Sequence, residues 1–136
     1  MDTIRKADYF SMEIPNKTGE GARVLGALRD AGVNLLAFTG FPAGRRAQLD
    51  FIPSETASFR AAARKLRMKV RSRKTVFLAE GDDRVGAIAE LCDKIAAAGI
   101  AMTAMDAISA GNGRYATMFW VDPRDVNKTA KALGAS

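Results

Sequence analysis

The chain contains one sequence pattern twice, at a constant spacing of 67 residues. The matched positions share residue type and place in the pattern: Phe10 with Phe77, Gly19 with Gly86, Leu28 with Ile95, and Gly32 with Gly99. A register that persists through a strand pattern, a loop and a helix pattern indicates a duplicated structural unit. A two-residue insertion at Asn112-Gly113 interrupts the register, which returns where Phe59 matches Val126. The sequence therefore predicts two similar units.

Each repeat has the order strand, helix, strand, strand, helix. Alternating apolar residues predict strands at 9–14, 33–41 and 47–52, and their counterparts at 75–79, 100–108 and 115–121. The first helices are expected to end at Gly32 and Gly99, because glycine is a common helix C-cap. The second helices are expected to begin near Ser54 and near Asp122, whose following proline suits a first helical turn. Asn112-Gly113 predicts a tight hairpin turn.

Residues 68–73 alternate apolar and basic side chains, which predicts a fourth strand in the first repeat. The resulting β-α-β-β-α-β order predicts an α+β fold of two tandem ferredoxin-like units, each an antiparallel sheet with helices on one face. The expected domains are residues 7–73 and 74–136. The second lacks a fourth strand of its own, and we expect residues 1–6 to supply it. The two units would then be related by a pseudo-twofold axis and share buried surface, since about 65 residues are marginal alone.

Composition excludes several kinds of site. The chain has no histidine and one cysteine, Cys92, which falls on the apolar face of a predicted helix. This excludes His-based catalytic triads, most transition-metal sites and an internal disulfide, and no metal or cofactor is expected. No apolar run approaches the roughly 20 residues of a membrane span, and no secretion signal is evident. The expected location is the cytoplasm.

The positive charge is concentrated in one stretch. Residues 60–74 read RAAARKLRMKVRSRK, with eight basic residues and no acidic one. Such a run can bind phosphates by releasing counterions. It can also be a basic helix end, favourable for the helix dipole, followed by a charged strand face that discourages aggregation. The second interpretation is favoured, and a nucleic-acid partner is not expected.

The junction between the first strand and first helix carries polar and glycine residues in both repeats. The stretches NKTGEGARVLGALRDAGVNLL and DDRVGAIAELCDKIAAAGIAM share Asn/Asp-Lys/Arg-x-Gly, a helix pattern, and Ala-Gly-Val/Ile opening the next strand. This pattern resembles the ACT domain, and the resemblance spans nearly the whole chain. It implies a stand-alone pair of ACT domains, which are regulatory modules that usually bind amino acids. The implied ligand lies between the junction loop of one domain and the second strand of the other.

Carried over to this chain, the resemblance implies two unequal ligand sites. The stronger site combines one junction loop with the opposite second strand, through Asp82, Asp83, Arg84, Val85, Gly86, Val33, Asn34 and Leu35. The second, weaker site combines Asn16, Lys17, Thr18, Gly19, Ile100, Ala101 and Met102. The inequality arises because the strand position held by Asn34 is Ala101 in the second repeat. Helix N-termini suit a carboxylate, and glycine lets the backbone approach a ligand closely.

Other interpretations stay open. Asn16 and Asp83 could simply cap helices. The pair could be a ligand-free scaffold that assembles with a partner enzyme or as a homo-oligomer such as a dimer. An RNA-binding ferredoxin-like module is less favoured, because the strands offer few paired exposed aromatic residues. Catalysis is not expected, since Asp82, Asp83 and Asp106 have no matching nucleophile or metal-ligand set.

Overall fold

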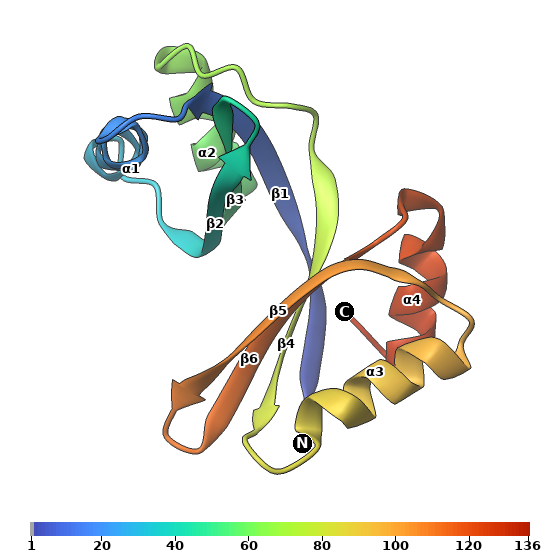
Figure 1. The fold of residues 1–136 in the computed structure, drawn as a ribbon. Coiled ribbons are helices and arrows are strands. Elements are labelled where there is room, and N and C mark those ends of the chain that lie inside the picture. The colour runs from blue at the N-terminus through green and yellow to red at the C-terminus, as the bar shows by residue number, and fades with distance from the viewer. Residues whose placement is uncertain (1) are drawn as a thin grey trace. The chain divides into compact units, whose positions relative to one another are not determined.

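The computed structural model describes residues 2–136 and shows the expected element order twice (Figure 1). The first set is β1 (Thr3–Pro15), α1 (Glu20–Asp30), β2 (Leu35–Ala43), β3 (Arg46–Pro53) and α2 (Thr56–Lys65). The second is β4 (Lys74–Asp82), α3 (Ala87–Ala97), β5 (Met102–Gly111), β6 (Arg114–Val121), the 3-10 turn η1 (Pro123–Asp125) and α4 (Val126–Leu133). The chain divides into two compact units. We call Asp8–Lys74 the amino-terminal unit, and Thr75–Ser136 with the segment up to Ala7 the carboxy-terminal unit.

The amino-terminal unit is an antiparallel sheet with two helices on one face. Its strand order is β2-β3-β1, and Phe10 of β1 lies opposite Phe51 of β3. Both rings pack with Phe59 of α2, at centroid distances of 4.8 Å to Phe10 and 5.4 Å to Phe51. Leu28 of α1 enters the same core. Because alternate strand residues point to one face, α1 and α2 cover a single side of this sheet.

The carboxy-terminal unit repeats this design. Its strands β4, β6 and β5 are antiparallel, with Phe77 opposite Phe119 in a stacked pair at 5.2 Å. The strand next to β4 is β1, whose residues up to Ala7 belong to this unit. Ile4 packs on the core of the unit, its C=O accepts from the N–H of Ser136 at 3.2 Å, and the N–H of Lys6 donates to the C=O of Ser136 at 3.1 Å.

The expected turn and cap residues adopt the conformations that their types favour. Asn112 and Gly113 have φ of 55° and 72°, as a two-residue hairpin with two left-handed positions requires. Gly32 and Gly99 directly follow the C-cap residues of α1 and α3 and have φ of 77° and 73°. The side chain of Asp122 accepts from the N–H of Arg124, but it opens the 3-10 turn η1 before the α-helix.

The predicted strand at residues 68–73 is wrong as a regular strand. The chain is extended there without a continuous ladder, and the N–H of Arg71 donates to the C=O of Ser11 at 2.8 Å. Met68 and Val70 do pack against the core, which explains the alternating pattern. The alternation thus reported correctly which side chains face inward, although it did not specify backbone pairing.

Candidate functional site

The junction loop of the carboxy-terminal unit is tied to the end of its β5–β6 hairpin. The N–H of Asp83 donates to the C=O of Gly113 at 2.8 Å, and the Asp83 carboxylate accepts from the hydroxyl of Ser109 at 3.2 Å. The neighbouring Asp82 accepts from Arg114 at 2.8 Å, and this hydrogen bond lowers the pKa of the Asp82 carboxyl. Two adjacent carboxylates are therefore held in defined positions at the loop.

The second half of this loop leads directly into α3. Arg84 forms an ion pair with Glu90 of α3, which raises the pKa of Arg84 and lowers that of Glu90. Val85 is fully exposed, and Gly86 begins the helix in the left-handed conformation with φ of 81°. The charge of Arg84 is thus directed toward the helix, while Val85 presents an apolar side chain to solvent.

The alternative interpretation, that Asn16 and Asp83 simply cap helices, is wrong. The residues at the cap positions are Gly19 and Gly86, both left-handed, and no capping side chain accepts a hydrogen bond from the first-turn N–H groups of α1 or α3. Glycine is suited to this conformation because it has no Cβ. The first turns of both helices therefore retain backbone N–H groups that no side-chain cap occupies, together with the partial positive charge of a helix N-terminus.

The junction loop of the amino-terminal unit is a short backbone turn with exposed side chains. The N–H of Lys17 donates to the C=O of Pro15 at 3.0 Å, and the N–H of Glu20 donates to the C=O of Lys17 at 3.3 Å. The side chains of Asn16, Lys17 and Thr18 are exposed. The loop therefore presents an amide, an ammonium and a hydroxyl beside an uncapped helix.

The starts of the two second strands differ in polarity. Asn34 is exposed and is held through its backbone, whose C=O accepts from both the N–H and the hydroxyl of Ser54. Its side-chain amide is consequently not needed for that anchoring. The corresponding Ala101 is also exposed but offers no polar group.

The flanking positions are similar in the two units. Val33 is partly buried against the core and Ile100 is buried, and Leu35 and Met102 begin β2 and β5. The structure thus places the residues of each predicted half-site together within its own unit. The combination of a loop from one unit with a strand from the other stays a prediction.

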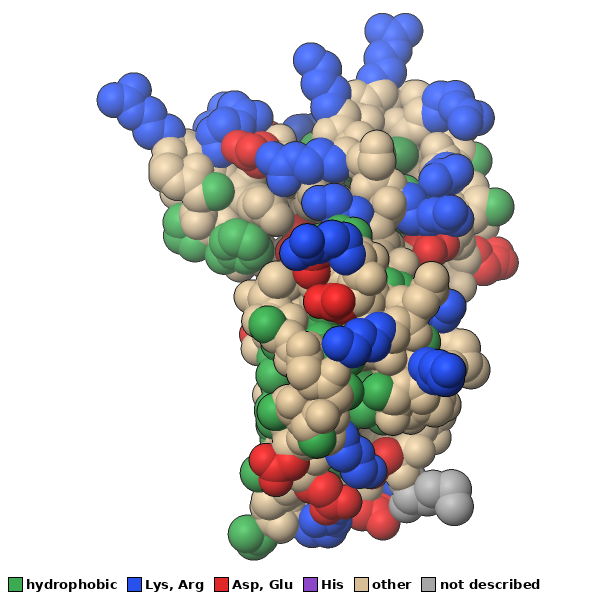
Figure 2. All heavy atoms as spheres, turned by 90° about the vertical axis from the view of Figure 1, so that its right-hand side faces the viewer, with side chains coloured by type: hydrophobic (Ala, Val, Ile, Leu, Met, Phe, Trp, Pro, Cys, Tyr) green, Lys and Arg blue, Asp and Glu red, His purple; other side chains and the backbone are tan. Residues whose placement is uncertain are grey.

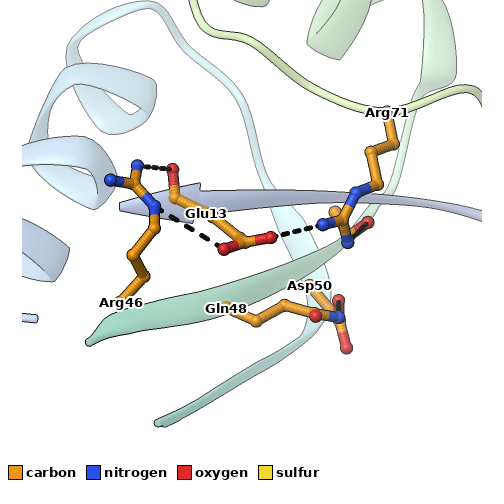
Figure 3. A network of polar contacts seen from close by, with 6 residues as sticks. Glu13, Arg46, Gln48, Asp50 and Arg71 are labelled. Atoms are coloured by element: carbon orange, nitrogen blue, oxygen red, sulfur yellow. Dashed lines mark hydrogen bonds and ion pairs between the residues drawn. The ribbon is translucent and has the colours of Figure 1, made fainter. Parts of the chain in front are cut away.

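A polar network on the amino-terminal unit lies outside the predicted loops (Figure 3). Asp50 of β3 is 7% exposed and accepts from the Thr39 hydroxyl at 2.9 Å and the Gln48 amide at 3.0 Å. Glu13 of β1 pairs with Arg71 at 2.6 Å and with Arg46 at 3.5 Å. The sheet face opposite the helices therefore carries a buried carboxylate with neutral donors, beside an arginine–glutamate cluster.

Among the described residues, register shows that the buried carboxylate belongs to one unit only. Ser11 pairs with Asp50 across β1 and β3, whereas Leu78 pairs with Met118 across β4 and β6. Burial, followed by the charge of Asp50, raises the pKa of the nearby Tyr9 phenol. Comparing the polarity of matched strand positions between the repeats is the sequence signal that could have located this face.

The remaining observations concern metal ligands, the cysteine and the length of the helices. In residues 2–136 no group of three or more His, Cys, Asp or Glu side chains is placed to hold a metal ion. Cys92 is partly buried, with its thiol 3.8 Å from the sulfur of Met105. No helix within the described part of the chain is long and apolar enough to cross a membrane.

These features define the class of fold: a tandem pair of ferredoxin-like units, each with a glycine-started helix after its first strand. No family model matches the sequence, and no curated protein matches it significantly. Among solved structures, protein BT0572 from Bacteroides thetaiotaomicron superposes with a TM-score of 0.82 at 20% identity, covering 96% of this chain and 88% of that one.

Two further solved structures are similar along their length. The regulatory subunit of aspartate kinase from Thermus thermophilus, in its ligand-free form, gives a TM-score of 0.65 at 14% identity and covers 98% of this chain and 94% of its own. A structure of aspartokinase alpha and beta subunits gives a TM-score of 0.62 at 15% identity, and the match covers 97% of this chain and 93% of that one. These likenesses confirm the predicted tandem fold.

Proposed function

We propose that this chain is a non-catalytic regulatory protein that binds an amino acid or a related small metabolite at the junction loops. The observation that carries the proposal is the uncapped helix N-terminus after Gly19 and after Gly86, each beside a polar loop. The cap position of each helix is held by glycine, three residues after Asn16 and after Asp83, whereas an Asn or Asp side chain is the stronger cap. Neither polar side chain caps its helix, which leaves the first-turn N–H groups without a side-chain acceptor, while the Asp83 carboxylate keeps acceptor capacity beyond its hydrogen bond from Ser109.

The chemistry of the loop suits a zwitterion. A ligand carboxylate is attracted by first-turn N–H groups and the positive end of the helix dipole. A ligand ammonium is attracted by carboxylate and amide oxygens, and Asp83 and Asn34 offer one of each. We propose that the stronger site joins the loop of Asp83 to the strand start of Asn34. The weaker site joins Asn16 to Ala101 and lacks a polar group on one side.

The similar proteins support a regulatory role. Two of the solved structures that share the fold over nearly their whole length are a regulatory subunit of aspartate kinase and aspartokinase subunits. By analogy, the partner of this chain would be a second copy of itself or an enzyme that it controls. The competing proposal is a ligand-free scaffold with the same assembly role.

A thermal-shift screen against the twenty amino acids and their precursors tests the proposal. A ligand at 100 times its dissociation constant stabilises by about 2.7 kcal/mol, which corresponds to roughly 9 °C for a chain of this size. Asp83→Asn keeps an acceptor for Ser109 but loses the charge, and Asn34→Ala removes the amide. Both are expected to abolish the shift, whereas Asp93→Ala on the exposed side of α3 should leave it intact.

Calorimetric titration of the hit then counts the sites. The proposal expects one strong site per chain. Two equal sites would contradict the inequality between Asn34 and Ala101, and silence across the whole panel would favour the ligand-free scaffold.

A further inference from the structure

The two units carry very different charge despite their common fold. Residues 8–74 contain 13 Lys and Arg against 6 Asp and Glu, whereas the rest of the chain contains 8 against 9. The amino-terminal unit therefore has a net charge of +7 and the carboxy-terminal unit −1. Figure 2 shows Lys and Arg side chains standing out from the molecular surface, and many belong to the unit that carries α1 and α2.

Part of this positive charge is neutralised locally. Glu13 pairs with Arg46 and Arg71, Asp8 lies 3.8 Å from Arg73, and the Arg60 guanidinium lies over the Phe10 ring at 5.7 Å. Of the remaining exposed cations of this unit that take part in no ion pair within residues 2–136, Lys17 and Arg45 lie in separate loops. The other five follow one another along the chain from the last turn of α2 to the start of β4: Arg64, Lys65, Arg67, Lys69 and Lys74. We call these five residues the basic ridge.

One member of the basic ridge occupies a strained backbone position. Arg67 has φ of 56° just beyond the end of α2. Its N–H donates to the C=O of Arg64, and the N–H of Met68 donates to the C=O of Ala63. This is the Schellman arrangement, which glycine normally occupies because a side chain is strained there. The other three helices have glycine at the matching position, at Gly32, Gly99 and Gly134.

Helix capping does not account for the ridge. The final carbonyls of α2 already accept backbone bonds from Leu66, Arg67 and Met68. The helix dipole acts within the last turn, so it favours Arg64 and Lys65 but not Lys69 or Lys74. An arginine at Arg67 costs backbone strain that glycine would avoid, and the cap gains nothing from its side chain.

We propose that the basic ridge binds the phosphate backbone of a nucleic-acid duplex, independently of base sequence. Nucleic-acid backbones are bound by clustered Lys and Arg without an apolar contact, and guanidinium groups match phosphate oxygens in a bidentate fashion. A protein partner or a membrane surface calls for several exposed apolar side chains. Within residues 64–74 the one large apolar side chain that is exposed is Leu66, at 38%, so this segment does not favour such a partner. A single strand calls for stacking aromatic residues, which residues 64–74 lack.

Fluorescence anisotropy with a labelled 25-base-pair DNA duplex, titrated between 50 and 200 mM salt, tests this assignment. If all five cations meet phosphates, the dissociation constant rises with salt with a log–log slope of about 4.5. Arg67→Gly is expected to weaken binding about five- to tenfold at 100 mM salt and to lower the slope by about 1. The same substitution removes the strain, so the melting temperature is expected to rise by about 3 °C.

Two matched variants separate charge from fold. Arg67→Lys keeps the charge and the strain, and it is expected to retain most of the affinity without the gain in melting temperature. Lys131→Ala removes one positive charge from the last turn of α4 in the other unit and is expected to leave duplex binding within about twofold of the parent chain.

Three results would overturn the proposal. One is the absence of duplex binding at 50 mM salt, and another is an equal loss of affinity in Arg67→Gly and Lys131→Ala. The third is tighter binding of polyglutamate or of vesicles rich in phosphatidylserine than of the duplex at the same ionic strength, since that outcome assigns the ridge to an acidic protein or a membrane.

Discussion

Replacing Ile4 by alanine is expected to destabilise the carboxy-terminal unit, although Ile4 lies at the opposite end of the sequence from most of that unit. Ile4 packs on the core formed by Phe77 and Phe119, and its carbonyl accepts from Ser136. Ile4→Ala deletes the apolar contact and leaves the backbone bond in place. The change therefore measures what the amino-terminal segment contributes by packing.

The size of the effect follows from the burial of Ile4. Full burial makes an isoleucine-to-alanine change cost about 2–5 kcal/mol, through lost transfer free energy and a residual cavity. Ile4 is partly buried, so we expect about 1–2 kcal/mol. Thr3→Ala, one residue away and exposed, is the matched control and is expected to change stability by no more than about 0.5 kcal/mol.

Tryptophan fluorescence can follow the unfolding of this unit. Its one tryptophan, Trp120, lies in β6, so urea unfolding followed by Trp fluorescence monitors the carboxy-terminal unit. With a urea dependence of about 2 kcal/mol per molar, Ile4→Ala should lower the unfolding midpoint by roughly 0.5–1 M. Hydrogen exchange should show the largest loss of protection in β4 and β6. An unchanged midpoint, or a loss of protection confined to α1 and α2, would refute the assignment of the amino-terminal segment to this unit.

Two further predictions concern local conformation and pH. Gly113→Ala should lower the free energy of unfolding by about 1 kcal/mol in urea, because alanine is strained at φ of 72°. The comparison variant is Ala116→Gly, which changes a residue of the adjacent strand β6 whose backbone is not left-handed. Burial is the main cause that raises the pKa of both tyrosines, Tyr9 and Tyr115, above 10.0, so absorbance at 295 nm should show neither ionising at the ordinary value. The native state then holds these protons more tightly than the unfolded chain, and stability present below pH 10 should fall as pH rises above it; an unchanged urea midpoint between pH 9 and 11 would contradict this.

The sequence was sufficient to predict the element order, because the repeat supplied two independent versions of each element. The turn at Asn112-Gly113 and the helix ends at Gly32 and Gly99 were also predictable, since their backbone conformations require these residue types. Residues 68–73 were not, because side-chain alternation reports burial while a strand also needs continuous pairing with a neighbour.

The candidate site was predictable only in part. The sequence identified both junction loops, but an Asn or Asp a few residues before a helix suggested a cap. In the structure the cap position of α3 is Gly86, three residues after Asp83, and Asp83 accepts a hydrogen bond from Ser109 instead. The network around Asp50 depends on which residues face each other across β3 and β2, and that register is visible only in the folded sheet.

Function in a duplicated fold is best sought where the two copies differ, because their shared residues are those that the fold itself requires. Phe10 and Phe77 occupy the same core position in both units. Asp50 and Met118 occupy matched sheet positions but give one unit a buried carboxylate and the other a thioether.

The same reasoning applies to the two proposed sites. Asn34 and Ala101 make the ligand half-sites unequal at a position that both units leave exposed. Arg67 occupies the left-handed position just beyond α2, where the other three helices have glycine. Its side chain therefore adds a positive charge and also strains the backbone. Neither Asn34 nor Arg67 is required by the tandem fold, because Ala101 and the three glycines satisfy the same backbone positions. The Asn34 amide and the Arg67 guanidinium are therefore the side-chain groups that ligand or partner binding, and not the fold, best explains.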